Sequence, residues 1–119
     1  MLHLAHTARY HQSFVGTPTN FAVGDWQISR VYAALNESRL ALQFAKLSLK
    51  ICQKNNLSQI LPSAYEGLAR AYAISKDYES ARNYIKKARE QLGKLVGLHE
   101  EDRRIYLDQI LETEELIGK

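Results

Sequence analysis

The chain has 119 residues, with 16 Lys and Arg against 13 Asp and Glu, so it fits one domain of small net charge. Only 6 Gly and 2 Pro leave few turn positions, which argues against a sandwich of many short strands. One cysteine excludes an intramolecular disulfide, and no apolar run reaches the roughly 20 residues that span a bilayer. The first residues lack a basic leader, so we expect a cytoplasmic protein with no membrane partner.

Residues 1–17 are expected to form a short N-terminal helix over 2–14 and a turn. Pro18 after Thr17 then predicts the first turn of the next helix. His3 and His6 share one face of the first helix, but His11 lies on another and no carboxylate is close in sequence. A metal site or a small enzyme built on these histidines is therefore the weakest of the alternatives.

An internal repeat follows, because residues 25–34 can be laid over residues 65–74 and the same offset of 40 continues through the next helix. The matching pairs include Ile28 with Leu68, Arg30 with Arg70, Tyr32 with Tyr72, Ala41 with Ala81 and Lys46 with Lys86. One offset serving two consecutive helices predicts two copies of a single helix–turn–helix unit.

Each unit is expected to contain two antiparallel helices with a short break between them. The first break covers residues 36–38, with Ser38 as the N-cap, and the second covers 75–77. Residues 50–54 are expected to lengthen the second helix of the first unit. Small residues such as Ala81 allow paired helices to approach closely, and we expect Ala81 and Tyr72 to be buried between them.

The second unit resembles a tetratricopeptide repeat, in which aromatic, small and apolar residues recur within one helix pair. The residues that carry this resemblance are Tyr65, Leu68, Ala69, Tyr72, Ala81, Ile85 and Ala88. The first unit matches more loosely. Arg9-Tyr10-His11, Gly16-Thr17-Pro18 and Trp26 with Ser29 and Arg30 also look like the opening of small repeat-containing bacterial proteins.

The resemblance implies one all-α domain with repeats at 18–57 and 58–97 and a capping helix at 98–119. It also implies a protein- or peptide-binding module, an adaptor or scaffold, and not an enzyme. The sequence contains no phosphate-binding glycine loop, no dinucleotide pattern and no zinc motif, so we expect no cofactor. Cys52 is expected to be buried and inert.

The last helix is predicted over residues 100–117, with acidic residues in its opening turn, where the helix dipole favours them. Its apolar residues are Ile105, Leu107, Ile110 and Leu111. Residues 99–119 hold 7 Asp and Glu against 3 Lys and Arg, whereas residues 1–98 hold 6 against 13. An acidic end therefore follows a basic body.

The candidate binding site consists of Trp26, Arg30, Glu66 and Arg70. In tetratricopeptide proteins the first helix of each pair lines a concave groove, and these residues fall on those helices one turn apart. Two arginines at equivalent positions suit a carboxylate, supplied by an acidic partner or by the C-terminal helix. Alternatively, Arg70 pairs with Glu66 within its own helix and Trp26 belongs to the core.

Nucleic-acid binding is the second functional hypothesis. Lys46, Lys50 and Lys54 form one stripe at helical spacing, and Lys86, Lys87 and Lys94 form a second cluster. A solvated helix surface explains the same pattern. Finally, an open helical stack exposes apolar end faces, which predicts a homodimer.

Overall fold

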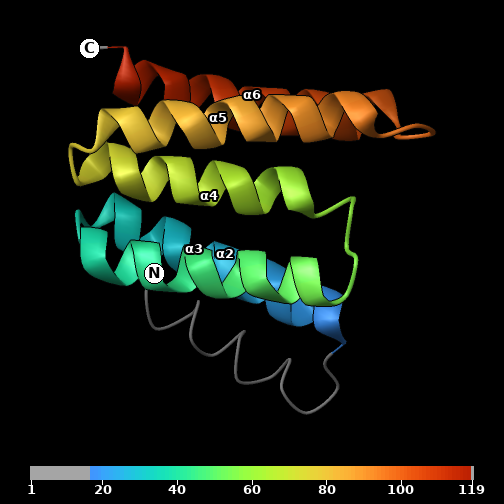
Figure 1. The fold of residues 1–119 in the computed structure, drawn as a ribbon, viewed down its shortest axis with the longest axis horizontal. Coiled ribbons are helices and arrows are strands. Elements are labelled where there is room, and N and C mark those ends of the chain that lie inside the picture. Colours follow the sequence, from blue (N-terminus) through green and yellow to red (C-terminus); the bar gives the residue numbers. More distant parts are fainter. Residues whose placement is uncertain (1–16, 119) are drawn as a thin grey trace.

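The computed structural model describes residues 17–118, and this part of the chain contains five α-helices and no β-strand. The helices are α2 (Pro18–Ala34), α3 (Ser38–Lys54), α4 (Leu61–Ile74), α5 (Tyr78–Lys94) and α6 (Glu100–Ile117), shown in Figure 1. The all-α prediction is confirmed for these residues. The helix predicted over residues 2–14, with the three N-terminal histidines, lies outside the described residues.

The repeat of 40 residues is visible in the backbone. Adding 40 to both ends of α3 gives both ends of α5, and adding 40 to the last residue of α2 gives the last residue of α4. The two turns also correspond, because Asn36 and Lys76 both have a positive φ, 59° and 69°. The amide of Glu37 donates to Tyr32 O at 2.8 Å, and that of Asp77 donates to Tyr72 O at 2.9 Å.

The observed start of α2 confirms the prediction from the sequence, whereas the predicted N-cap of α3 is wrong. Thr17 caps α2 by accepting a hydrogen bond from the amide of Asn20, and Pro18 lies in the first turn as predicted. Ser38, however, is not the N-cap of α3. Glu37 holds that position because its carbonyl already accepts from the amide of Ala41, so the backbone at Ser38 is helical.

Helix α4 lies at the centre of the described structure and contacts each of the other four helices. Figure 1 shows it between the α2–α3 pair and the layer that contains α5 and α6. Its sequence explains this position, because small side chains on several sides let neighbouring helices approach closely. These buried small residues are Ser63, Ala64, Gly67, Ala69, Ala71 and Ala73.

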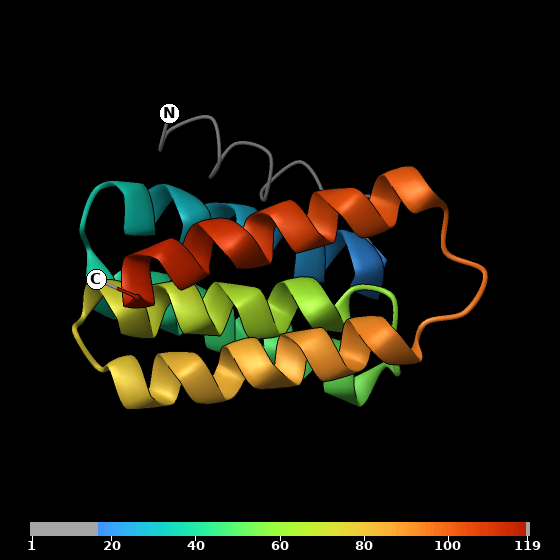
Figure 2. The same ribbon diagram turned by 90° about the horizontal axis from the view of Figure 1, so that it is seen from above.

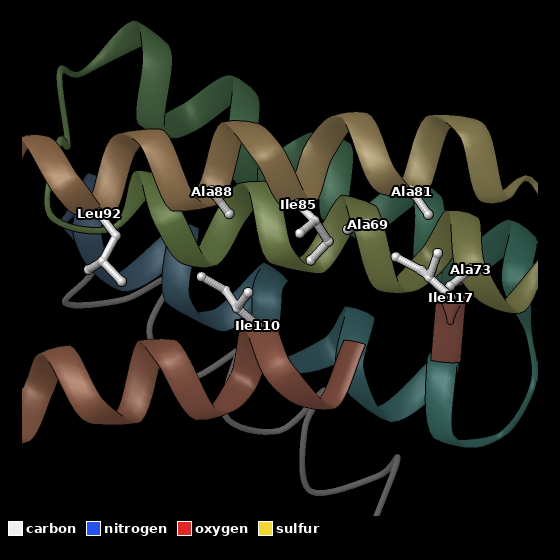
Figure 3. Packing of buried hydrophobic residues seen from close by; sticks show 8 residues of the cluster. All are labelled: Ala69, Ala73, Ala81, Ile85, Ala88, Leu92, Ile110 and Ile117. Carbon is white, nitrogen blue, oxygen red and sulfur yellow. The ribbon is translucent and has the colours of Figure 1, made fainter. Parts of the chain in front are cut away.

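Helix α6 packs across α4 and α5, and Figure 2 shows it passing over α4. Ile110 and Ile117 insert between alanines and larger apolar residues of those two helices, as Figure 3 shows. Arg103 adds two hydrogen bonds to the last carbonyls of the α5 segment, to Leu92 O at 3.0 Å and Leu95 O at 2.9 Å. Orphan carbonyls at that helix end are thus satisfied by α6.

The four apolar residues noted in the last helix are not all buried. Ile110 is buried and Leu107 half-buried, but Ile105 and Leu111 are 52% and 50% exposed. The reason is the rotation of α6, which turns the polar residue Thr113 inward, one turn after Ile110.

Ala81 and Tyr72, the two residues that we expected to be buried between paired helices, differ in how deeply they are buried. Ala81 is fully buried as predicted. Tyr72 is only half-buried, contrary to the prediction, because the ring on which it stacks at a centroid distance of 5.7 Å, that of Tyr84, is itself only half-buried. Tyr32 and Phe44, the equivalent residues of the first unit, stack at the same distance. No helix in residues 17–118 has the length and apolarity needed to cross a bilayer.

Candidate partner-binding groove

The four predicted site residues lie together. Trp26 and Arg30 come from consecutive turns of α2, and Glu66 and Arg70 come from the matching turns of α4. The guanidinium carbon of Arg30 lies 5.1 Å from the centre of the Trp26 ring, in a cation–π contact. The indole nitrogen of Trp26 donates to Glu66 Oε1 at 3.3 Å, which joins the two pairs of residues.

Glu66 is the buried centre of this cluster, with only 1% of its surface exposed. Besides the indole, Arg70 Nε donates to its Oε2 at 3.0 Å and Thr113 Oγ1 donates to the same atom at 2.8 Å. A buried carboxylate is tolerated when donors and a cation surround it. The carboxylate therefore connects α2, α4 and α6.

Both arginines reach one carboxylate of α6. Arg70 Nη2 lies 3.3 Å from Glu112 Oε2 and hydrogen-bonds to it, while Arg30 Nη2 lies 3.7 Å from the same oxygen. The predicted pairing of Arg70 with Glu66 within α4 is also present, so Arg70 contacts two carboxylates. The acidic group between the arginines comes from the C-terminal helix, one of the two sources expected from the sequence.

Trp26 separates two cavities along α2. One, of about 170 Å³, is lined by Val23 and Trp26 of α2, by Ile60 and Ser63 at the start of α4, and by Tyr106 and Gln109 of α6. The other, of about 380 Å³, is lined by Trp26, Gln27, Arg30, Val31, Ala34 and Arg70. Both cavities lie beside α2 and share Trp26; we call the two together the α2–α6 groove and define it by these lining residues.

Gly67 allows the Trp26 indole to lie against α4. A Cβ atom at this position would come within 3.0 Å of the Cδ1 atom of the indole, closer than side chains normally pack. Gly67 therefore has a packing role, since it occupies a helical position where most residues favour the helix more strongly. Together with the hydrogen bond to Glu66, this contact holds the indole between the two cavities.

The lysines of the second hypothesis lie on α3 and α5. All six are exposed, and among residues 17–118 no lysine side chain lies within 4.0 Å of a carboxylate. Lys87 Nζ lies 5.0 Å above the ring of Tyr84. The arrangement provides unneutralised positive charge on helices away from the α2–α6 groove.

Cys52 is buried, and burial raises its pKa to about 11. Its side chain is therefore a neutral thiol at physiological pH, which is the opposite of an activated nucleophile. Among the described residues, no group of three His, Cys, Asp or Glu side chains is arranged to hold a metal ion. His3, His6 and His11 are not among these residues.

Sequence reasoning named the C-terminal helix as one possible source of the acidic group, but it did not identify which residues of α6 reach the site. Thr113, Glu112 and Tyr106 contact or line the site from a helix more than 40 positions away in the chain. The only sequence signal was the general excess of acidic residues after residue 98.

Comparison of the chain with models of protein families, with curated proteins and with solved structures finds no match.

Proposed function

We propose that this chain is a tetratricopeptide-like binding module, an adaptor or scaffold, whose α2–α6 groove accepts a segment of a protein partner. The observation that carries the proposal is the pair of cavities on either side of Trp26. A half-buried aromatic wall with a few polar groups nearby is typical of binding sites. The two copies of the helix–turn–helix unit support the assignment, since such repeats bury a continuous core and leave one surface for binding.

The polar groups of the groove favour a peptide over a small apolar ligand. Arg30 and Arg70 provide charged donors at one end, while Val23, Trp26 and Tyr106 provide apolar and aromatic surface at the other. An extended segment with an acidic residue near an apolar one would use both ends.

Site-specific photo-crosslinking tests the proposal in native cells. A benzophenone amino acid replaces Gln27, which is exposed and lines the larger cavity, or Gln43, which is exposed on α3. We expect a defined protein to crosslink at Gln27 and not at the matched Gln43 control. Equal crosslinking of the same proteins from both positions would contradict a binding role for the groove.

Nucleic-acid binding through α3 and α5 is the second candidate, supported by the lysines that lack a carboxylate neighbour. Phosphate contacts would weaken steeply as salt rises. A gel shift with single- and double-stranded DNA and RNA at low and moderate salt tests this hypothesis. We expect Lys50→Glu to abolish any shift if the α3 stripe makes the contacts, and Gln27→Glu to leave it unchanged.

A further inference from the structure

The carboxylates of Glu66 and Glu112 contact the arginines of the site, and they differ in burial and in the number of hydrogen bonds that they accept. Glu66 is buried and accepts three hydrogen bonds. The side chain of Glu112 is 60% exposed and accepts one hydrogen bond, from Arg70. Glu66 is thus part of the folded core, whereas Glu112 lies at the surface, where another group can replace it.

The donors of Arg30 are not fully used. Its contact with Glu112 is an ion pair at 3.7 Å, which is too long for a good hydrogen bond. Its Nη1 atom is buried, yet within the described structure it has no hydrogen-bond acceptor. A buried guanidinium donor without a partner is costly, so a better-placed acceptor would be stabilised there.

The space for such an acceptor is present. The cavity of about 380 Å³ is lined by both arginines, together with Trp26, Gln27, Val31 and Ala34. A carboxylate entering there can receive two parallel hydrogen bonds from one guanidinium, a geometry that Glu112 does not achieve with Arg30. The apolar part of the same ligand would rest against Val31 and the indole.

Replacement of Glu112 need not unfold α6. This helix is held by the buried Ile110 and Ile117, by the hydrogen bond from Thr113 to Glu66, and by Arg103. A further ion pair joins Arg89 Nη2 to Glu114 Oε1 at 2.6 Å. By contrast, a solvent-exposed ion pair such as that of Glu112 is worth about 0–1 kcal/mol.

We infer, building on the proposed function, that Arg30 and Arg70 form a carboxylate-binding subsite for an acidic peptide and that Glu112 occupies it in the free protein. Binding of the partner exchanges one carboxylate for another. The acidic C-terminal helix then acts as an internal competitor, so a partner must present a carboxylate to bind well. Positive charge elsewhere on the body, on α3 and α5, would attract the same acidic segment from a distance.

The sole tryptophan of the chain is Trp26, so its fluorescence reports directly on the α2–α6 groove. The probes are acetyl-Leu-Glu-Leu-amide, its neutral counterpart acetyl-Leu-Gln-Leu-amide, and acetyl-Leu-Gln-Leu with a free carboxyl end. The second peptide controls for charge, and the third distinguishes a side-chain carboxylate from a terminal one. Each peptide is titrated into the full chain.

The decisive comparison is between Glu112→Ala and Glu115→Ala. Both remove one negative charge and one exposed glutamate from α6, but Glu115 contacts neither arginine. We expect Glu112→Ala to bind a carboxylate peptide about two- to fivefold more tightly than the wild type. This factor corresponds to the free energy of the exposed ion pair that the peptide no longer has to displace. Glu115→Ala should match the wild type, and the neutral peptide should gain nothing from either substitution.

Arg30→Gln in the Glu112→Ala background should remove the preference for the carboxylate peptides. Circular dichroism checks its helix content, and Arg30→Lys, which keeps the charge but loses the planar fork, is a second variant with an expected intermediate affinity. Equal affinities of Glu112→Ala and Glu115→Ala for every peptide would overturn the inference while leaving the proposed groove intact. Absence of binding by any peptide would also overturn it, and the crosslinking experiment would then decide the proposed function separately.

Discussion

The Glu66 carboxylate concentrates the polar contacts of three helices on one side chain. Trp26, Arg70 and Thr113 are all donors, and a carboxylate can accept from all of them because it has about four lone-pair positions. A neutral amide at this position has only one acceptor oxygen, so at least one buried donor would lose its partner. The same side chain therefore matters for the stability of the fold and for the position of the site residues.

We predict that Glu66→Gln lowers the free energy of unfolding by roughly 3–5 kcal/mol, the cost of breaking a buried ion pair. Urea denaturation followed by circular dichroism measures it. Glu112→Gln is the matched control, because Glu112 is exposed and its loss should cost less than about 1 kcal/mol. Similar midpoints for the two variants would mean that the hydrogen bonds of Glu66 contribute little.

The buried thiol of Cys52 should make the stability of the protein depend on pH in the alkaline range. Burial raises its pKa to about 11 from an ordinary value of 9.0, so between these values the folded protein keeps a proton that the unfolded chain releases. Stability should therefore fall as pH rises from about 9 to about 11. Burial also raises the pKa of Tyr72 and Tyr106, which adds to the same trend.

Thermal unfolding across this pH range provides the measurement. In Cys52→Ala the decline with pH should be shallower, since the thiol no longer contributes, whatever the variant's stability at pH 7. A thiol reagent should react slowly with the native protein at pH 8 and rapidly after denaturation. Identical pH slopes for the wild type and Cys52→Ala would contradict the assignment.

Helix α6 contributes to both the site and the core. Its residues Glu112 and Thr113 contact Arg70 and Glu66, and its apolar side chains pack against α4 and α5. Three of its residues line or contact the groove from one side: Tyr106, Gln109 and Glu112. Tyr106 also donates to the carbonyl of Gln59, before α4. The orientation of α6 about its own axis thus decides which residues reach the site.

We predict that Ile110→Ala lowers the unfolding free energy by about 2–5 kcal/mol, as expected for a large side chain removed from a well-packed core. Leu111→Ala, next to it in the chain but half exposed, should change stability by less than about 0.5 kcal/mol. Denaturant titration of both variants checks the rotation of α6. The comparison is made at low protein concentration, where the predicted homodimer dissociates. A larger loss for Leu111→Ala under these conditions would show that the helix is turned differently.

At the scale of the whole molecule, apolar side chains remain on the outer surface. Ile105, Leu111 and Leu116 of α6 are all exposed, as is Val96 in the connection before it. Exposed apolar residues that gather on one element often belong to an interface. They favour the α6 surface for the predicted homodimer.

We therefore expect light scattering to report a dimer at high micromolar concentration and a monomer for Leu111→Glu, because a charge at an apolar contact is strongly unfavourable. Leu35→Glu introduces the same charge at the end of α2, where a similarly exposed leucine lies, and should leave the dimer intact. A monomeric wild-type protein at this concentration would remove the homodimer from consideration.

Local sequence patterns were enough to predict the helices of residues 18–117 and their repetition. The offset of 40 residues, the start of α2 at Pro18, the extension of α3 to Lys54 and the bounds of the last helix all follow from periodicity and local breaks. These signals are local, since helical hydrogen bonds and capping join residues only a few positions apart. The pairing of Arg30 with Arg70 as equivalent positions also follows from the repeat.

The residues that surround these arginines depend on how the helices pack and could not be identified from local patterns. Glu112 contacts Arg70, which lies 42 positions earlier in the chain. Thr113 contacts Glu66, which lies 47 positions earlier. The sequence identified Ile105 and Leu111 only as apolar residues of the last helix, and the packing of Ile110 and Ile117 against α4 and α5 leaves both of them exposed. The rotation of a helix about its axis depends on the helices against which it packs. Both the burial of apolar surface and the hydrogen bonding of a buried carboxylate involve residues that are distant in sequence.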